Sequence, residues 1–189
     1  MEYVLRSARY LARACMQQKI QPGDHVVDAT AGNGHDTLFL AELVGKNGHV
    51  TAFDIQKEAL DHTSLLLNEN KMSDRVTLVH DGHQNLDLYI HEPVSAIMFN
   101  LGWLPGGDKT ITTLWKTTKE AIQKALAALL PLGVCTICVY PGHAEGENEK
   151  NELAVMLKQL KPQDFNVLRH TFINAGPGAP ECYIIQKQE

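Results

Sequence analysis

The sequence predicts an α/β fold in which helices cover both faces of a seven-stranded, mostly parallel sheet. Short apolar segments alternate with amphipathic helical segments, which is typical of a parallel sheet. The chain then closes with a helix and two strands joined by a loop, an ending that places one antiparallel strand near the C-terminus. A length of 189 residues suits one domain, 1–189, with an N-terminal helix in 1–20 that packs on the domain or extends it.

Hydrophobic periodicity and helix breakers give the expected elements in order. The first helix, 4–18, has apolar residues on one face and ends before Gln21, Pro22 and Gly23. Strands are expected at 25–29, 49–54, 76–80, 94–100, 133–140, 165–173 and 183–186. Further helices are expected at 36–44, 57–70, 110–130 and 147–160.

The composition is that of an ordinary globular protein, 44% hydrophobic and 21% charged. The chain shows no signal peptide and no membrane span, so we expect a cytoplasmic protein. The net charge of −5 does not by itself imply a nucleic-acid partner, although a local basic patch is enough for one. Cys135 and Cys138 form a C-x-x-C, but residues three apart in a strand point to opposite faces, so no metal site is expected.

The strongest motif runs from His25 to Thr37 and comprises a strand, a glycine turn and the start of a helix. Gly32 and Gly34 allow the backbone to turn sharply and to approach a ligand. The N–H groups at the start of the helix attract an anion, either a phosphate or the methionine carboxylate of S-adenosylmethionine (SAM). Thr37 stands where a dinucleotide fingerprint has its third glycine, which favours SAM over NAD.

Acidic residues close the next two strands. Asp54 lies about twenty residues after Gly34, where a carboxylate binds both ribose hydroxyls; the alternative is a cap for the following helix. Asp81 closes the third strand, where methyltransferases place an acidic residue against the adenine amino group; the alternative is a plain turn aspartate. Gly82 and His83 would line the base pocket. Because ligands of open α/β sheets bind at these strand ends, the three features together predict a SAM site.

The ends of the fourth and fifth strands carry candidates for the reacting group. Asn100 and Trp103 stand where many amino-group methyltransferases have an Asn/Asp-Pro-Pro-aromatic motif, but here Leu-Gly separates them. Asn100 would orient an amine and Trp103 would stack on a base, unless the first merely ends a strand and the second packs in the core. Tyr140 and His143 follow the fifth strand, and His143 is a candidate proton acceptor.

These motifs resemble a family of small bacterial proteins labelled rRNA methylases, whose members are assigned as tRNA 5-(aminomethyl)-2-thiouridine methyltransferases of the MnmM type. The similar segments cover almost the whole chain: DATAGNGHDT, AFDIQ, HDGH, FNLGWLPGGDK, YPGH and NAGPGAPEC. The discriminating one is FNLGWLPGGDK, which general methyltransferases lack. The resemblance implies a Rossmann-like class I methyltransferase domain and a homodimer. It also implies SAM-dependent N-methylation of the aminomethyl group of wobble 2-thiouridine in tRNA, giving 5-methylaminomethyl-2-thiouridine.

The resemblance also implies roles for individual residues. Cofactor contacts carried over by motif are Asn33, His35, Asp36, Thr37, Asp54, Gln56, Asp81 and His83. To these the strand ends and the glycine turn add Asp28, Thr30, Gly32, Gly34, Ile55 and Gly82. The modified base would face Asn100, Leu101, Gly102, Trp103, Leu104 and Pro105, with Tyr140 and His143 beside them.

Arginines on the first helix are candidates for RNA contacts. Arg6, Arg9 and Arg13 lie at i, i+3 and i+7, hence on one helix face. They would bind phosphates of the expected partner, a tRNA anticodon stem-loop, or else form a solvated basic face. The residues leave three other functions open: a methyltransferase of another RNA or a small metabolite, an NAD-dependent oxidoreductase, and a binding module without catalysis.

Overall fold

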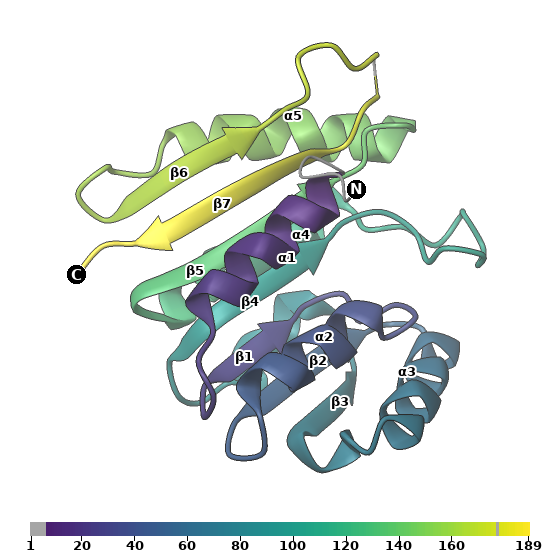
Figure 1. The fold of residues 1–189 in the computed structure, drawn as a ribbon. Helices are drawn as coiled ribbons and strands as arrows, with labels where there is room; N and C mark the ends of the chain where they lie inside the picture. Colours follow the sequence, from purple (N-terminus) through teal and green to yellow (C-terminus); the bar gives the residue numbers. More distant parts are fainter. Residues whose placement is uncertain (1–6, 177) are drawn as a thin grey trace.

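The computed structural model describes residues 7–176 and 178–189. A seven-stranded sheet with the order β3-β2-β1-β4-β5-β7-β6 runs through the molecule (Figure 1). Its strands are β1 (His25–Asp28), β2 (His49–Asp54), β3 (Val76–His80), β4 (Val94–Asn100), β5 (Leu129–Val139), β6 (Phe165–His170) and β7 (Glu181–Lys187). Strands β1 to β5 are parallel, and β7 is antiparallel to both β5 and β6. The predicted sheet, with one antiparallel strand near the C-terminus, is confirmed.

Helices cover both faces of this sheet, as predicted (Figure 1). One face carries α1 (Ala8–Lys19), α2 (His35–Val44) and α3 (Lys57–Glu69). The other carries α4 (Trp115–Ala128) and α5 (Ala144–Lys158). Two 3-10 segments, η1 (Ser73–Arg75) and η2 (His83–Leu88), flank β3.

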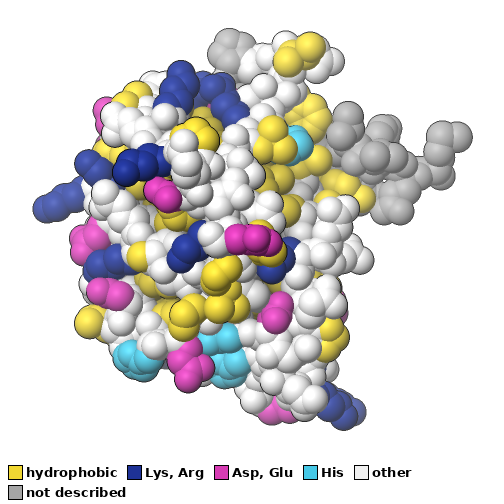
Figure 2. Space-filling view, turned by 90° about the vertical axis from the view of Figure 1, so that its left-hand side faces the viewer, with side chains coloured by type: hydrophobic (Ala, Val, Ile, Leu, Met, Phe, Trp, Pro, Cys, Tyr) yellow, Lys and Arg dark blue, Asp and Glu magenta, His cyan; other side chains and the backbone are white. Residues whose placement is uncertain are grey.

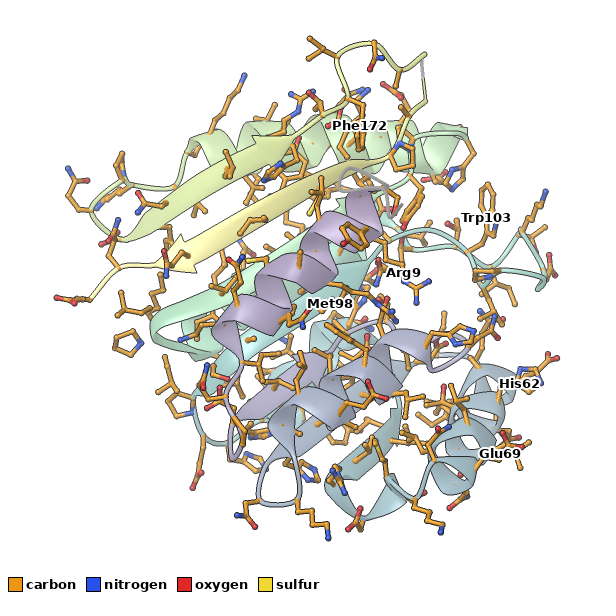
Figure 3. All side chains as sticks on the ribbon, in the orientation of Figure 1. Arg9, His62, Glu69, Met98, Trp103 and Phe172 are labelled. Carbon is orange, nitrogen blue, oxygen red and sulfur yellow. The ribbon has the colours of Figure 1, made fainter. Side chains whose placement is uncertain are left out.

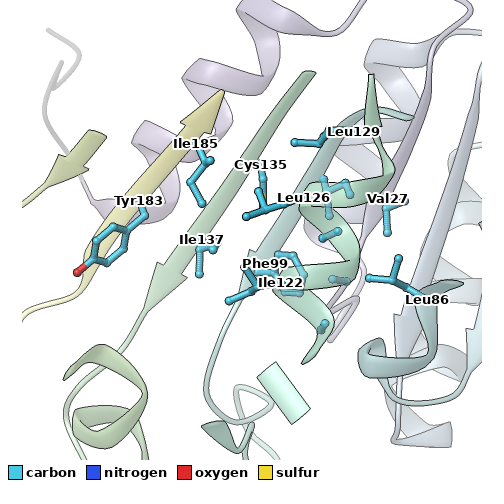
Figure 4. Close-up of a cluster of buried hydrophobic side chains, with 14 of the residues drawn as sticks. Val27, Leu86, Phe99, Ile122, Leu126, Leu129, Cys135, Ile137, Tyr183 and Ile185 are labelled. Atoms are coloured by element: carbon cyan, nitrogen blue, oxygen red, sulfur yellow. The ribbon is translucent and has the colours of Figure 1, made fainter. Parts of the chain in front are cut away.

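Each face of the sheet buries its own hydrophobic cluster. The cluster beneath α4 and α5 includes Phe99, Ile122 and Ile137, all fully buried (Figure 4). The cluster beneath α1 and α2 includes Met16. Cys135 belongs to the first cluster and Cys138 to the second, so the two thiols point to opposite faces as predicted. In the part of the chain that the structure describes, no group of three His, Cys, Asp or Glu side chains is placed to hold a metal.

The segment before α4 folds differently from the expected helix at 110–130. Residues 102–113 form a hairpin loop, which we call the acceptor loop, and α4 begins only at Trp115. The Thr113 N–H donates to the Gly102 carbonyl at 3.0 Å, and Trp103 forms an isolated bridge with Thr112. Because of these contacts, residues 110–113 belong to the loop and not to the expected helix.

Other boundaries differ by a few residues. β5 begins at Leu129 rather than at 133, because Leu129 pairs with Val94 before an irregularity in the ladder. α5 begins at Ala144 rather than at 147, with His143 as its N-cap residue. Of the predicted first helix, 4–18, residues 4–6 lie outside the described residues.

The parallel strands begin on the side of the molecule that faces the viewer in Figure 2. Basic and acidic side chains are interspersed on this surface. The first residues of β1 and β2, His25 and His49, place their rings 5.5 Å apart on this side. None of the helices described here combines the length and the apolar character that a bilayer crossing requires.

Candidate functional site

A cavity of about 630 Å³ lies at the carboxyl ends of β1 to β5. β1 lies between β2 and β4. After β3 the chain crosses from the β2 side of β1 to β4 on its other side, and open α/β sheets bind ligands at such a point. Among the predicted cofactor residues, those that line the cavity are Thr30, Gly32, Asn33, His35, Asp36, Asp54, Ile55, Gln56, Asp81, Gly82 and His83. Among the predicted substrate and catalytic residues, those that line it are Arg9, Asn100, Leu101, Gly102, Trp103, Leu104, Pro105, Tyr140 and His143.

A smaller group of predicted residues stands behind the cavity wall. The buried Asp28 accepts hydrogen bonds from Thr37 Oγ1 at 2.7 Å and from the Thr30 N–H at 3.1 Å, so it holds the glycine turn from beneath. Gly34 has φ +81°, and a Cβ there would lie 2.8 Å from the Thr63 Cα, so glycine is required for α2 to approach α3. Asp28, Gly34 and Thr37 therefore shape the site without lining it. Arg13 does not line it either, and Arg6 lies outside the described residues.

Asp54 fastens the glycine turn to the end of β2. Its Oδ2 accepts the Gly32 N–H and its Oδ1 accepts the Gln56 N–H, both at 2.9 Å. Gln56, not Asp54, is the N-cap residue of α3, so the helix-cap alternative is wrong. The half-buried carboxylate keeps lone pairs for a ligand in the cavity.

Asp81 is both a turn aspartate and a cavity residue. Its Oδ1 accepts the Gly82 N–H at 2.7 Å and Asn85 Nδ2 at 2.9 Å, and its Oδ2 accepts the Tyr89 hydroxyl at 3.0 Å. The hydrogen bond from Asn85, followed by the others, lowers the pKa of Asp81, so the group is ionised at neutral pH.

His83 is buried and lines the cavity, as Asp81 does. Burial lowers its pKa to about 4, so the ring is neutral at physiological pH. Its Nδ1 lies 3.3 Å from the Ala29 carbonyl, which can only accept, so Nδ1 carries the proton and Nε2 is an acceptor.

The buried Asp36 joins three elements at one carboxylate. Arg9 Nε of α1 donates to its Oδ2 at 2.8 Å, and Arg13 Nε donates to its Oδ1 at 2.5 Å. Asn100 Nδ2, at the tip of β4, donates to Asp36 Oδ2 at 2.8 Å. Arg9 and Arg13 thus hold a buried acid instead of forming the solvated basic face considered above.

The bond to Asp36 also fixes the orientation of the Asn100 amide. Only the NH₂ group can face a carboxylate, so Oδ1 must point the other way. Asn100 Oδ1 is buried and meets no donor within the described residues, although an unpaired buried acceptor is costly. The Asn100 N–H donates to Thr30 Oγ1 at 2.7 Å, which locks the residue to the end of β1.

Trp103 extends from the acceptor loop at the cavity rim (Figure 3). It is partly exposed, so it does not pack in the core. The His143 ring packs edge-on against it at a centroid distance of 4.3 Å, and His143 Nε2 lies 3.2 Å from Thr112 Oγ1. Lys109 Nζ lies 5.5 Å from the centroid of Trp103 on its other approach. The indole is therefore held by two neighbours, and it also lines the cavity.

Two further contacts join the acceptor loop to the rest of the site. Asn33 Nδ2, in the glycine turn, donates to the Pro105 carbonyl at 3.1 Å. The fully buried Glu149 of α5 accepts from Thr113 Oγ1 at 2.6 Å and from Thr118 Oγ1 at 2.5 Å. Burial raises the pKa of Glu149.

Sequence reasoning missed one part of the site. Glu149 carries no motif, and residues 111–117 were assigned to a helix. The additional cavity residues are Ala29, Ala31, Phe53, Gln84, Ile111, Thr112, Thr113, Leu114 and Thr117. Ala29 and Ala31 flank Thr30, so the glycine motif is a sequence signal for these two residues.

Comparisons with known proteins identify the family. The family model described as "Putative rRNA methylase" matches residues 50–186. An Arabidopsis thaliana protein named "tRNA (mnm(5)s(2)U34)-methyltransferase, chloroplastic" is 36% identical over 97% of this chain and 70% of its own.

Solved structures agree with this family. An rRNA methylase from Clostridium thermocellum is 43% identical, with a TM-score of 0.96, over 98% of this chain and 100% of its own. A Streptococcus mutans methyltransferase in complex with SAH is 33% identical, with a TM-score of 0.88, over 97% of this chain and 99% of its own. The chain belongs to the rRNA methylase family, and it is a SAM-dependent methyltransferase with the class I fold.

Proposed function

We propose that this enzyme methylates the amino group of 5-aminomethyl-2-thiouridine at the wobble position of tRNA, giving 5-methylaminomethyl-2-thiouridine. The name of the Arabidopsis relative supports this substrate, because the alignment covers nearly the whole chain. The observation that carries the proposal is the paired arrangement at the cavity rim. Asn100 offers an unpaired amide oxygen, and the aromatic side chain of Trp103 lines the same cavity.

The residues of the cavity fit SAM. Its volume falls within the range of about 300–1,000 Å³ typical of small-molecule sites. Asp54 would accept the ribose hydroxyls and Asp81 the adenine amino group, with Phe53 as an apolar neighbour of the base. The glycine turn, Thr30 to Gly34, would surround the amino-acid tail. When bound, SAM supplies an electrophilic methyl group on a sulfonium.

The acceptor half of the cavity suits an amine nucleophile. Asn100 Oδ1 would accept an N–H of the aminomethyl group and so aim its lone pair. Apolar side chains such as Leu101 and Leu104 also line the cavity and would disfavour the ammonium form, since burial lowers the pKa of an amine. Trp103 would stack on the modified base, and His143 would position Trp103 and receive the proton released from the amine.

The same proposal names the remaining partners. Arg13 pairs with the cavity residue Asp36, and Lys109 contacts the cavity residue Trp103; both would meet phosphates of the anticodon stem-loop. The resemblance adds a homodimer and a cytoplasmic location. Light scattering of the purified protein and fractionation of cells measure these two directly.

Mass spectrometry of wobble nucleosides tests the proposed reaction. A strain that lacks this protein should lose 5-methylaminomethyl-2-thiouridine and accumulate its unmethylated aminomethyl precursor. Purified enzyme with SAM should convert that tRNA, and Asn100→Ala should lower turnover more than it lowers SAH affinity. Asn166→Ala, on the exposed strand β6, is the matched control. An unchanged nucleoside profile, together with methyl transfer to a small metabolite, would favour the second candidate, a metabolite methyltransferase.

A further inference from the structure

We propose that Arg9, on α1, the helix that precedes β1 in the chain, binds the carboxylate of the cofactor's amino-acid tail. Arg9 is the residue of α1 that lines the cavity, and its side chain extends from α1 toward the open space in front of Trp103 (Figure 3). The inference rests on SAM as the cofactor and is independent of the RNA substrate.

The order of the strand tips indicates which end of the ligand Arg9 meets. Asp81 follows β3 and Asp54 ends β2, so the adenosine half belongs on that side of the cavity. Arg9 contacts Asp36 on α2, which follows β1, and Asp36 in turn bonds Asn100 at the end of β4. Arg9 therefore lies at the end of the cavity where the amino-acid tail belongs.

The local charge favours an anion at this end. Two guanidinium groups share the single carboxylate of Asp36, which leaves an excess positive charge. Arg9 reaches Asp36 through Nε alone, and within the described residues its two Nη groups have no recorded acceptor. These Nη groups form the planar fork that binds a carboxylate with two parallel hydrogen bonds.

Arg13 differs from Arg9 in its hydrogen bonds and in its position relative to the cavity. It also pairs with Asp36 through Nε, but its Nη2 donates to the His35 carbonyl at 2.5 Å. It does not line the cavity. The two arginines therefore support the same acid, while only Arg9 has donors at the cavity.

The N-terminus of α2 also contributes positive electrostatic potential at this end of the cavity. Its N-cap residue, Gly34, provides no side-chain acceptor for the first N–H groups of this helix of 10 residues. The positive end of the helix dipole therefore points toward the same end of the cavity as Arg9. A carboxylate bound there would be stabilised from both sides.

Isothermal titration calorimetry with two ligands tests the assignment. SAH contains the carboxylate, whereas decarboxylated SAH, an adenosyl thiopropylamine, lacks that group alone. Arg9→Gln should weaken SAH binding by about 10- to 100-fold, the scale of a charge-assisted hydrogen bond. It should change binding of the decarboxylated ligand by less than about threefold, because that ligand has no carboxylate for Arg9 to bind. Arg13→Gln, which removes the other arginine that pairs with Asp36, should weaken both ligands equally and only slightly.

Several results would overturn the proposal. Equal losses for both ligands in Arg9→Gln would assign Arg9 a structural role. Unchanged SAH binding with a weakened tRNA complex would assign it to RNA. Thermal unfolding of each variant checks that the fold is kept. If the unmodified enzyme failed to bind SAH at all, the cofactor assignment itself would fail, and failure to methylate tRNA with normal SAH binding would affect only the proposed function.

Discussion

Asp28 sits at the base of the site without access to solvent, and its two hydrogen bonds do not offset the cost of burying its charge. Burial, reinforced by the neighbouring charge of Asp36, raises the pKa of Asp28 to about 7 from its usual 3.8. The unfolded chain therefore releases this proton near pH 4 and the folded chain near pH 7. Between these values the folded state binds the extra proton, so the free energy of unfolding decreases as the pH rises.

Replacing Asp28 with asparagine should remove this dependence. Measured against Asp28→Asn, the stability of the unmodified protein should decrease from pH 4 to pH 7 and then stay constant. His83 acts in the opposite direction, because its folded pKa of about 4 lies below its usual value, and the comparison cancels its effect. Thermal unfolding at several pH values measures the difference. A flat difference between the unmodified protein and Asp28→Asn over this pH range would refute the prediction.

Among single residues, the positions that sequence alone could indicate are those set by local geometry. Asp54 and Asp81 close strands, and the turn at Gly32 and Gly34 follows one, so their placement at the cavity follows from strand order. The contact between Arg9 and Asp36 joins residues 27 apart in the chain. Only the packing of α1 on the sheet determines that contact, and no periodicity within either segment encodes it.

At the scale of elements, the acceptor loop depends on a carboxylate in another helix. Glu149 accepts from Thr113 Oγ1, which in turn accepts the Gly102 N–H at 2.8 Å, one residue before Trp103. Glu149 lies outside the cavity, so it is a positioning residue whose effect passes through the loop.

Glu149→Ala should lower kcat/KM for tRNA by about 10- to 100-fold, the scale of a small misplacement of reacting groups. SAH affinity should change by less than about threefold, because no cofactor residue contacts Glu149. Glu149→Gln keeps one acceptor oxygen and should restore part of the activity. The exposed Glu152→Gln on the same helix is the control. Equal losses in tRNA activity and SAH affinity would contradict a role limited to the acceptor loop.

Most of the helices and strands could be predicted from the sequence, and each of the two main exceptions has a local cause. All seven strands and the five long helices follow from the pattern of apolar residues. The strands form one sheet and the helices cover it, so each element must bury an apolar face. The assignment failed at 110–114, where side-chain bonds such as that of Thr113 compete with helix formation. It also failed at Leu129, where a strand begins before Pro131 despite that residue's missing N–H.

For the molecule as a whole, α1 is part of the core. Ala8, Ala12 and Met16 are buried against the sheet, where α1 contacts β4, β5 and β7. We therefore expect residues 1–189 to behave as one cooperative domain, with the first helix folding together with the sheet.

Met16→Ala should lower the free energy of unfolding by about 2–5 kcal/mol, the usual cost of truncating a buried methionine. The exposed Gln17→Ala, on the same helix, should change it by about 0.5 kcal/mol or less. Calorimetry should show one transition for both variants. A separate early transition that involves α1 alone would contradict the single-domain description.

The antiparallel course of β7 has a practical consequence. α1 starts beside the cavity and runs to the amino edge of the sheet, whereas β7 carries the chain away from the cavity to end at that same edge (Figure 1). The chain therefore enters α1 next to Arg9, while a purification tag fused after Lys187 would leave from the far side of the molecule. Affinity measurements on this enzyme should accordingly be made with the tag at the C-terminus.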